Sequence, residues 1–181
     1  MNAYTKYTIA LTLSLSIIVN MAVLAQTKVG GAVPSITDVY AVGTIPQSST
    51  DSLVLNSQRL NIVVFSGTQC APCISAIPSL AKLAAKYPDG LTILTIYPFE
   101  GKYRDDQSRQ QTNHRILQHY QHAHISDNYR LFVSASPSSL IDKWAIQGIP
   151  TFAVVDKLGR LLHRSSSVEE VAYLVNYFLS E

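Results

Sequence analysis

The sequence predicts an α/β protein in which a central mixed β-sheet has helices on both faces. Two observations support this fold class. Short runs of apolar, β-branched residues alternate with segments of three-to-four-residue apolar periodicity, which are typical of buried strands and amphipathic helices. Near the C-terminus, two further strands flank a turn at residues 156–159. Strands separated by helices pair in parallel and hairpins pair antiparallel, so one sheet should contain both kinds of pairing.

The composition limits the class of protein. A length of 181 residues allows one domain with a sizeable core and hardly two. Hydrophobic residues make up 47% and charged residues 14%, which is typical of a globular chain and not of a disordered one. The formal charge of +2, with no lysine–arginine cluster, argues against nucleic-acid partners.

The N-terminus has the pattern of a secretory signal peptide. Lys6 precedes an apolar stretch over residues 9–19, and the small residues Val23 and Ala25 occupy the two positions that a signal peptidase reads before Gln26. The apolar stretch is shorter than the roughly 20 residues that a membrane span needs. The sequence therefore predicts cleavage after Ala25.

Export would determine the cellular compartment of the mature chain and the residues that form its domain. A mature chain in the periplasm, or in another extracytoplasmic space, would be soluble and would lie where disulfides persist. The alternative is a retained membrane anchor over residues 7–24. We therefore assign residues 1–25 to a signal peptide and expect a single domain over residues 26–181.

The first half of the mature chain contains the clearest strand pattern. Residues 61–66 include four consecutive apolar side chains, three of them β-branched, as expected for a central strand buried on both faces. Residues 35–42 and 52–55 alternate in polarity and predict an N-terminal β-hairpin extension. Apolar residues at helical spacing then predict a helix over residues 74–87, and a second buried strand is expected over residues 91–97.

The second half continues the alternation and ends in a helix. Ser167 and Glu170 have the spacing of a capping box, and apolar residues recur on one helical face after them. The predicted elements are a helix over residues 105–122, a strand over 129–133, a short helix over 136–144, strands over 151–155 and 160–164, and a final helix after residue 167.

The two cysteines of the chain stand in a Cys70-Ala71-Pro72-Cys73 turn between a buried strand and a helix. Cys70 falls at the helix N-terminus, where unpaired backbone N–H groups and the helix dipole favour a thiolate. Cys73, one turn later, is close enough to resolve a mixed disulfide. Pro72 shapes the turn, since the first helical turn does not need its missing N–H. The pattern favours thiol–disulfide exchange with Cys70 as the attacking thiol.

The cysteine pair has two other interpretations, a static disulfide and half of a metal site. A static disulfide over so short a loop would add little stability. A zinc site needs about four ligands, and the sequence has no second cysteine pair. His114, His119, His122 and His124 lie in or near one predicted helix, but without an acid cluster beside them we interpret them as a solvated helix end. We expect no metal and no cofactor.

A second motif, Gly148-Ile149-Pro150-Thr151-Phe152, precedes a predicted strand. Together with the cysteine turn it makes the chain resemble the thioredoxin superfamily, and within it the exported TlpA-like or ResA-like branch. Besides these two motifs, the resemblance rests on the strand at residues 61–66, Pro78 and the segments 144–147 and 155–160.

The resemblance has definite implications for the fold and the site. It implies a thioredoxin-like fold with a cis peptide bond before Pro150, which would face the cysteines. The backbone of Ile149 would then pair with an extended segment of a substrate protein by strand addition.

The chain departs from this family at three positions. Gln69 stands where an aromatic residue usually precedes the first cysteine, and Val64 and Ala76 stand where acids usually assist the proton transfer of the buried thiol. Deprotonation of Cys73 would then rely on solvent or on a polar group such as Thr68 or Gln69. These departures leave a second hypothesis open, a non-catalytic peptide-binding module with the same fold.

The sequence thus predicts an extracytoplasmic thiol–disulfide oxidoreductase that acts on protein thiols and disulfides, in the reducing direction that the family branch favours. Its expected partners are protein substrates and a membrane-bound or other thiol electron donor, and we expect a monomer. Thr68 and Cys70 also suggest a peroxiredoxin-like peroxidase, but that family places Thr three residues before the cysteine instead of two.

Overall fold

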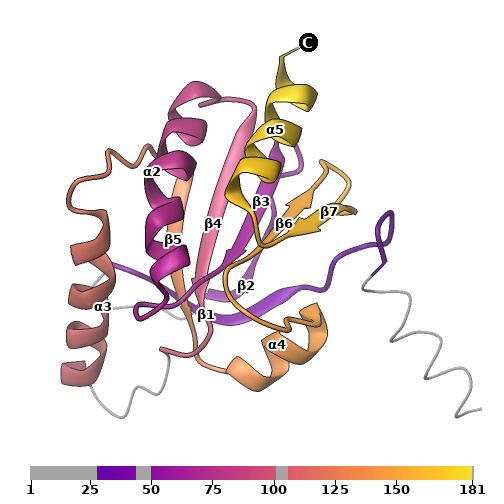
Figure 1. Ribbon diagram of the computed structural model, residues 1–181. Helices are drawn as coiled ribbons and strands as arrows, with labels where there is room; N and C mark the ends of the chain where they lie inside the picture. Colours follow the sequence, from indigo (N-terminus) through magenta and orange to yellow (C-terminus); the bar gives the residue numbers. More distant parts are fainter. Residues whose placement is uncertain (1–27, 44–49, 101–105, 181) are drawn as a thin grey trace, which may run out of the picture.

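A computed structural model describes residues 28–43, 50–100 and 106–180 of the chain, so the predicted signal peptide lies outside the described residues. Seven strands form one sheet in the order β2-β1-β5-β4-β3-β6-β7 (Figure 1). The strands are β1 (Ile36–Ala41), β2 (Thr50–Leu53), β3 (Leu60–Phe65), β4 (Leu91–Tyr97), β5 (Tyr129–Ser134), β6 (Thr151–Val155) and β7 (Leu161–Ser165). The helices are α2 (Ala71–Lys86), α3 (Asp106–Tyr120), α4 (Pro137–Trp144) and α5 (Val168–Leu179).

The sheet is mixed, as the sequence predicts. β3 pairs in parallel with β4, and β4 pairs in parallel with β5, because helices connect these strands. The pairs β3–β6, β6–β7 and β1–β2 are antiparallel, and the last of these is the predicted N-terminal hairpin. β1 also joins that hairpin to β5. Every residue of β3 is buried, in agreement with its predicted place inside the sheet.

Alternate residues of β3 point to opposite faces and belong to two hydrophobic cores. Ile62 and Val64 belong to the core that α2, α3 and α5 cover. Val63 and Phe65 belong to the core on the other face, where α4 packs. Trp144 of α4 is fully buried, and its ring centroid lies 5.3 Å from that of Phe65. Helices therefore cover both faces, as predicted (Figure 1).

Only half of the predicted capping box forms at the start of α5. The N–H of Glu170 donates to Ser167 Oγ at 3.2 Å, as expected. The Glu170 carboxylate does not return to the Ser167 N–H; it accepts from the Ser165 hydroxyl and pairs with His163 at 2.9 Å. Ser165, at the end of β7, provides its own oxygen as the acceptor for the Ser167 N–H at 3.0 Å, so the carboxylate is not needed there.

Within residues 28–43, 50–100 and 106–180, no helix has both the length and the apolar character needed to span a bilayer.

Candidate active site

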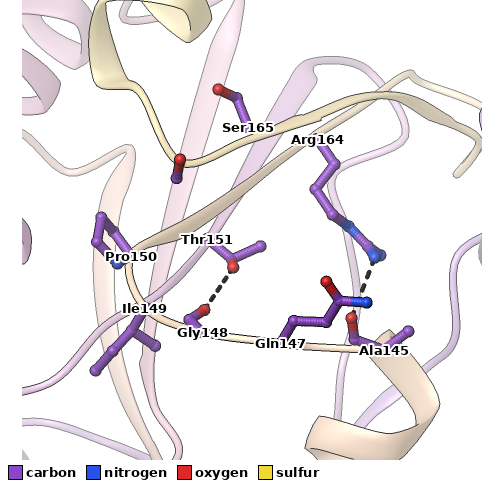
Figure 2. A pocket seen from close by; sticks show the side chains of 9 residues that line it. Ala145, Gln147, Gly148, Ile149, Pro150, Thr151, Arg164 and Ser165 are labelled. Atoms are coloured by element: carbon purple, nitrogen blue, oxygen red, sulfur yellow. Dashed lines mark hydrogen bonds between the residues drawn. The ribbon is translucent and has the colours of Figure 1, made fainter.

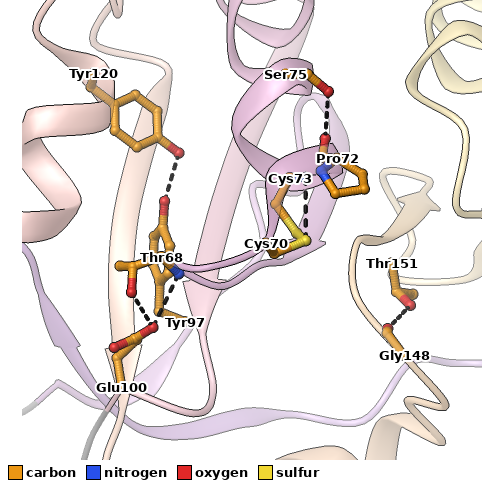
Figure 3. The surroundings of a disulfide bond; sticks show 10 residues. All are labelled: Thr68, Cys70, Pro72, Cys73, Ser75, Tyr97, Glu100, Tyr120, Gly148 and Thr151. Carbon is orange, nitrogen blue, oxygen red and sulfur yellow. Dashed lines mark hydrogen bonds between the residues drawn. A yellow bond between two sulfur atoms is a disulfide. The ribbon is translucent and has the colours of Figure 1, made fainter.

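Cys70 and Cys73 form a disulfide at the N-terminus of α2, with their Cα atoms 5.2 Å apart (Figure 3). Cys70 is the N-cap of the helix, and the Cys73 N–H donates to Cys70 Sγ at 3.3 Å. Pro72 stands in the first turn, as predicted. Because this N–H belongs to the first turn of the helix, where N–H groups have no backbone partner within the helix, it is free to donate to the sulfur. The same contact would stabilise a thiolate at Cys70 once the disulfide is reduced.

The two sulfur-bearing residues differ in exposure. Cys70 is half-buried and its neighbours Ala71 and Pro72 are exposed, whereas Cys73 is only 4% exposed. A second molecule can therefore approach Cys70 more readily than Cys73. This asymmetry agrees with an attacking role for Cys70 and a resolving role for Cys73.

The surroundings of α2 at this end are apolar at the two positions where the family usually has acids. Val64 of β3 and Ala76 of α2 are buried and belong to the same hydrophobic core. An apolar environment disfavours the charged form of a thiol. Neither position supplies a proton acceptor for Cys73.

A carboxylate that the sequence analysis missed contacts the loop before Cys70. Glu100 Oε1 accepts from the Thr68 N–H at 3.0 Å and from the Thr68 hydroxyl at 2.6 Å (Figure 3). Its second oxygen lies 3.8 Å from Arg115 Nη2, and the Glu100 side chain is 14% exposed. Glu100 lines a cavity of about 550 Å³ together with Cys70.

The topology explains why Glu100 reaches this loop. Thr68 follows the C-terminal end of β3, and Glu100 follows the C-terminal end of β4, the parallel neighbour of β3. The carboxyl ends of parallel strands meet at one edge of a sheet, so loops that are distant in sequence come together there. In the sequence, Glu100 is visible only as a polar residue after a predicted strand, and this pattern does not specify which loop it contacts.

Tyr97 is the last residue of β4, three positions before Glu100. Its hydroxyl donates to the Tyr120 hydroxyl at 3.1 Å (Figure 3). Burial raises the pKa of Tyr97 to about 12, so this phenol stays protonated at neutral pH. Tyr97 therefore packs and donates a hydrogen bond but does not exchange protons.

The Ile149–Pro150 peptide bond is cis, the geometry that the resemblance implies. Antiparallel pairing of β3 with β6 places Thr151 opposite Phe65, so the segment before β6 lies next to the loop that leads to Cys70. A side chain at Gly67 would place its Cβ 2.7 Å from Ile149 Cδ1. Glycine at position 67 therefore allows Ile149 to approach the cysteine loop closely.

Ile149 lies between two cavities. One is the cavity of about 550 Å³ that contains Cys70 and Glu100. The other has a volume of about 630 Å³ and is lined by the segment that holds Pro150 and by the end of β7, including Arg164 (Figure 2). The cis-proline segment thus separates a cavity at the disulfide from a cavity at the edge of the sheet.

The histidines predicted to form a solvated helix end lie in α3 or just after it. His114, His122 and His124 are exposed, and His119 is partly exposed. No group of three or more His, Cys, Asp or Glu side chains that could hold a metal occurs in the described part of the chain.

These features define a protein of the thioredoxin fold with a Cys-x-x-Cys disulfide at the N-terminus of α2. No family model matches the sequence, and a search of curated proteins finds no match either. Solved structures match well: the thioredoxin domain of a thiol-disulfide oxidoreductase from Bacteroides vulgatus has a TM-score of 0.62 at 18% identity, covering 84% of this chain and 98% of its own.

Two further solved structures are similar to this chain. A thiol:disulfide interchange protein from a Bacteroides species has a TM-score of 0.63 at 19% identity and covers 86% of this chain and 93% of its own. A putative thiol:disulfide interchange protein DsbE from Chlorobium tepidum has a TM-score of 0.58 at 14% identity, covering 81% and 96% of the two chains. The predicted thioredoxin-like fold is confirmed.

Proposed function

We propose that this protein is an extracytoplasmic thiol–disulfide oxidoreductase that acts on protein disulfides through a mixed disulfide at Cys70. The observation that supports this most directly is the Cys70–Cys73 disulfide at the N-terminus of α2, half-exposed on the attacking side and close to a cis-proline segment. The similar solved structures bear the names of thiol–disulfide oxidoreductases and interchange proteins, which agrees with protein thiols as substrates.

The reaction in the reducing direction needs only the two cysteines and a thiol donor. The Cys70 thiolate attacks one sulfur of a substrate disulfide, forms a mixed disulfide and releases the other substrate sulfur as a thiolate. The Cys73 thiolate then attacks Cys70 Sγ, which releases the second substrate thiol and closes the Cys70–Cys73 disulfide. Two electrons pass to the substrate, and an external dithiol donor reduces the disulfide again.

The cis-proline segment would dock the substrate. Pro150 has no N–H, and the preceding residue Ile149 can exchange backbone hydrogen bonds with an extended peptide, as in strand addition to a sheet. Such a peptide would cross the segment between the two cavities and present its cysteine to Cys70.

The first prediction concerns turnover. The reduced protein should catalyse the reduction of insulin by dithiothreitol, and the aggregation of the released insulin chain measures the rate. A rate equal to that of dithiothreitol alone would contradict the enzyme and favour the non-catalytic peptide-binding module. The reduction potential of the Cys70–Cys73 couple then decides the direction, since this fold family covers about −270 to −120 mV.

The second prediction concerns processing. Protein expressed with its full N-terminus and exported should have an intact mass that begins at Gln26, because Val23 and Ala25 satisfy the small-residue rule for cleavage. Replacing Ala25 by a bulky residue should block this cleavage and serves as the control. Recovery of the uncleaved wild-type chain in the membrane fraction would instead indicate an anchor over residues 7–24.

A further inference from the structure

The cavity of about 630 Å³ beside the cis-proline segment contains a charged group that the proposed mechanism does not use. Arg164 is the only charged residue among the described residues that line it (Figure 2). Several of the remaining lining residues present hydroxyl, amide or backbone polar groups. All of the remaining lining residues are neutral: Ala145, Gln147, Gly148, Ile149, Pro150, Thr151, Ser165 and Ser166. The cavity thus combines one cation with neutral polar walls.

The guanidinium of Arg164 has few acceptors. Arg164 Nη1 donates to the Ala145 carbonyl at 3.4 Å, a long bond, and Arg164 Nε is buried without an acceptor in the described part of the chain. Burial also lowers the pKa of Arg164 from its usual value, although an arginine remains charged at neutral pH. A partly buried cation with open donors is stabilised by an anion that enters the cavity.

The two acids nearest in sequence are already engaged. Glu169 accepts from the Ser167 hydroxyl at 2.8 Å, and Glu170 accepts from the Ser165 hydroxyl and pairs with His163. Neither acid is among the residues that line the cavity. The Thr151 hydroxyl is also engaged, because it donates to the Gly148 carbonyl at 2.6 Å. Arg164 is therefore the charged group of this cavity that has donors left for a ligand.

The position of the cavity beside Ile149 indicates which class of ligand would enter it. Ile149 lines both this cavity and the cavity that contains Cys70, so a peptide paired with the Ile149 backbone would extend from one to the other. Because Ile149 lines both cavities and residues of an extended strand are about 3.3 Å apart, we place the side chain that enters the second cavity one or two positions from the reacting cysteine. The volume is ample for a carboxylate side chain, and arginine binds carboxylates with two parallel hydrogen bonds.

We propose that Arg164 binds an acidic side chain of the substrate protein, one or two residues from its reacting cysteine, and so selects acidic segments as substrates. This proposal rests on the proposed function, because it assigns a substrate class to the same groove.

The test uses short peptides whose single cysteine forms a mixed disulfide with thionitrobenzoate. Cys70 attacks the peptide sulfur and releases the coloured thiolate, so absorbance gives the rate with the reduced protein. In separate peptides, Glu or Gln occupies one of the two positions before the cysteine or one of the two positions after it. The rate of each peptide with the protein is divided by the rate of the same peptide with a small free thiol. At one position or more, Glu should react about fivefold faster than Gln, and added salt should reduce the difference.

Arg164→Gln should abolish this preference, and Arg164→Lys should retain part of it because the charge remains. Lys157→Gln is the matched control, since Lys157 is exposed on the same hairpin and does not line the cavity. If Arg164→Gln does not fold, the wild-type preference and its salt dependence decide the outcome. The carboxylate site is wrong if no Glu peptide reacts more than twofold faster than its Gln partner, or if the preference survives in Arg164→Gln. If the Gln peptides also react no faster with the reduced protein than with the small thiol, the proposed function fails as well.

Discussion

Cys73→Ser should accumulate a mixed disulfide between Cys70 and a substrate protein, whereas Cys70→Ser should form none and should lose insulin turnover completely. The physical reason is the asymmetry at the end of α2. The helix end and the Cys73 N–H favour a thiolate at Cys70, which is half-exposed, while Cys73 is buried among apolar side chains. Without Cys73 the attack still occurs, but resolution does not. Non-reducing electrophoresis and the mass of the adducts measure both results.

Alkylation of the reduced wild-type protein gives an independent measurement of the same asymmetry. Iodoacetamide at limiting concentration should modify Cys70 before Cys73, which peptide mapping detects. Ser75→Ala serves as a control variant, because Ser75 is exposed in the first turns of α2 and its hydroxyl donates to the Pro72 carbonyl at 3.0 Å, away from both sulfur atoms. Faster modification of Cys73, or adducts formed by Cys70→Ser, would reverse the assignment of the two roles.

The sequence predicted the parts of this fold and site that depend on neighbouring residues. The four consecutive apolar residues after Asn61, three of them β-branched, indicated a buried strand, because such a run is typical of a strand covered on both faces. The position of Cys70 at a helix N-terminus followed from the strand, the turn and the helical periodicity after it. Pro150 could be placed near the cysteines only through the family resemblance, since its local sequence would suit an ordinary strand entry.

The residues that the sequence did not predict acquire their surroundings from distant parts of the chain. Glu100 reaches Thr68 because β3 and β4 pair in parallel, and Arg164 reaches Ala145 because β6 and β7 pair antiparallel beside the cis-proline segment. A polar residue at the end of a strand does not reveal which loop lies opposite. The capping box failed in part for a local reason, since the hydroxyl of Ser165, two residues earlier, competes for the Ser167 N–H.

Glu100→Ala should lower the rate of insulin reduction about 10- to 100-fold. Glu100 holds the loop before Cys70 through two hydrogen bonds to Thr68, which is itself buried. Loss of the acceptor leaves a buried backbone N–H without a partner, which costs about 1–3 kcal/mol of unfolding free energy. A displacement of a reacting group by about 1 Å can reduce a rate about 100-fold. Insulin kinetics and urea unfolding of the same preparation measure both effects.

Glu100→Gln distinguishes the position of the acceptor from its charge. The amide oxygen can still accept from the Thr68 N–H and hydroxyl, so this variant should keep its rate within about threefold of the wild type, although the negative charge is gone. Thr68→Val removes only the hydroxyl bond and should give an intermediate loss. Arg115→Gln should have little effect, because its contact with Glu100 is long, at 3.8 Å, and Arg115 is half-exposed. If Glu100→Gln loses as much activity as Glu100→Ala, the charge of Glu100 acts on the cysteines and the positioning role is wrong.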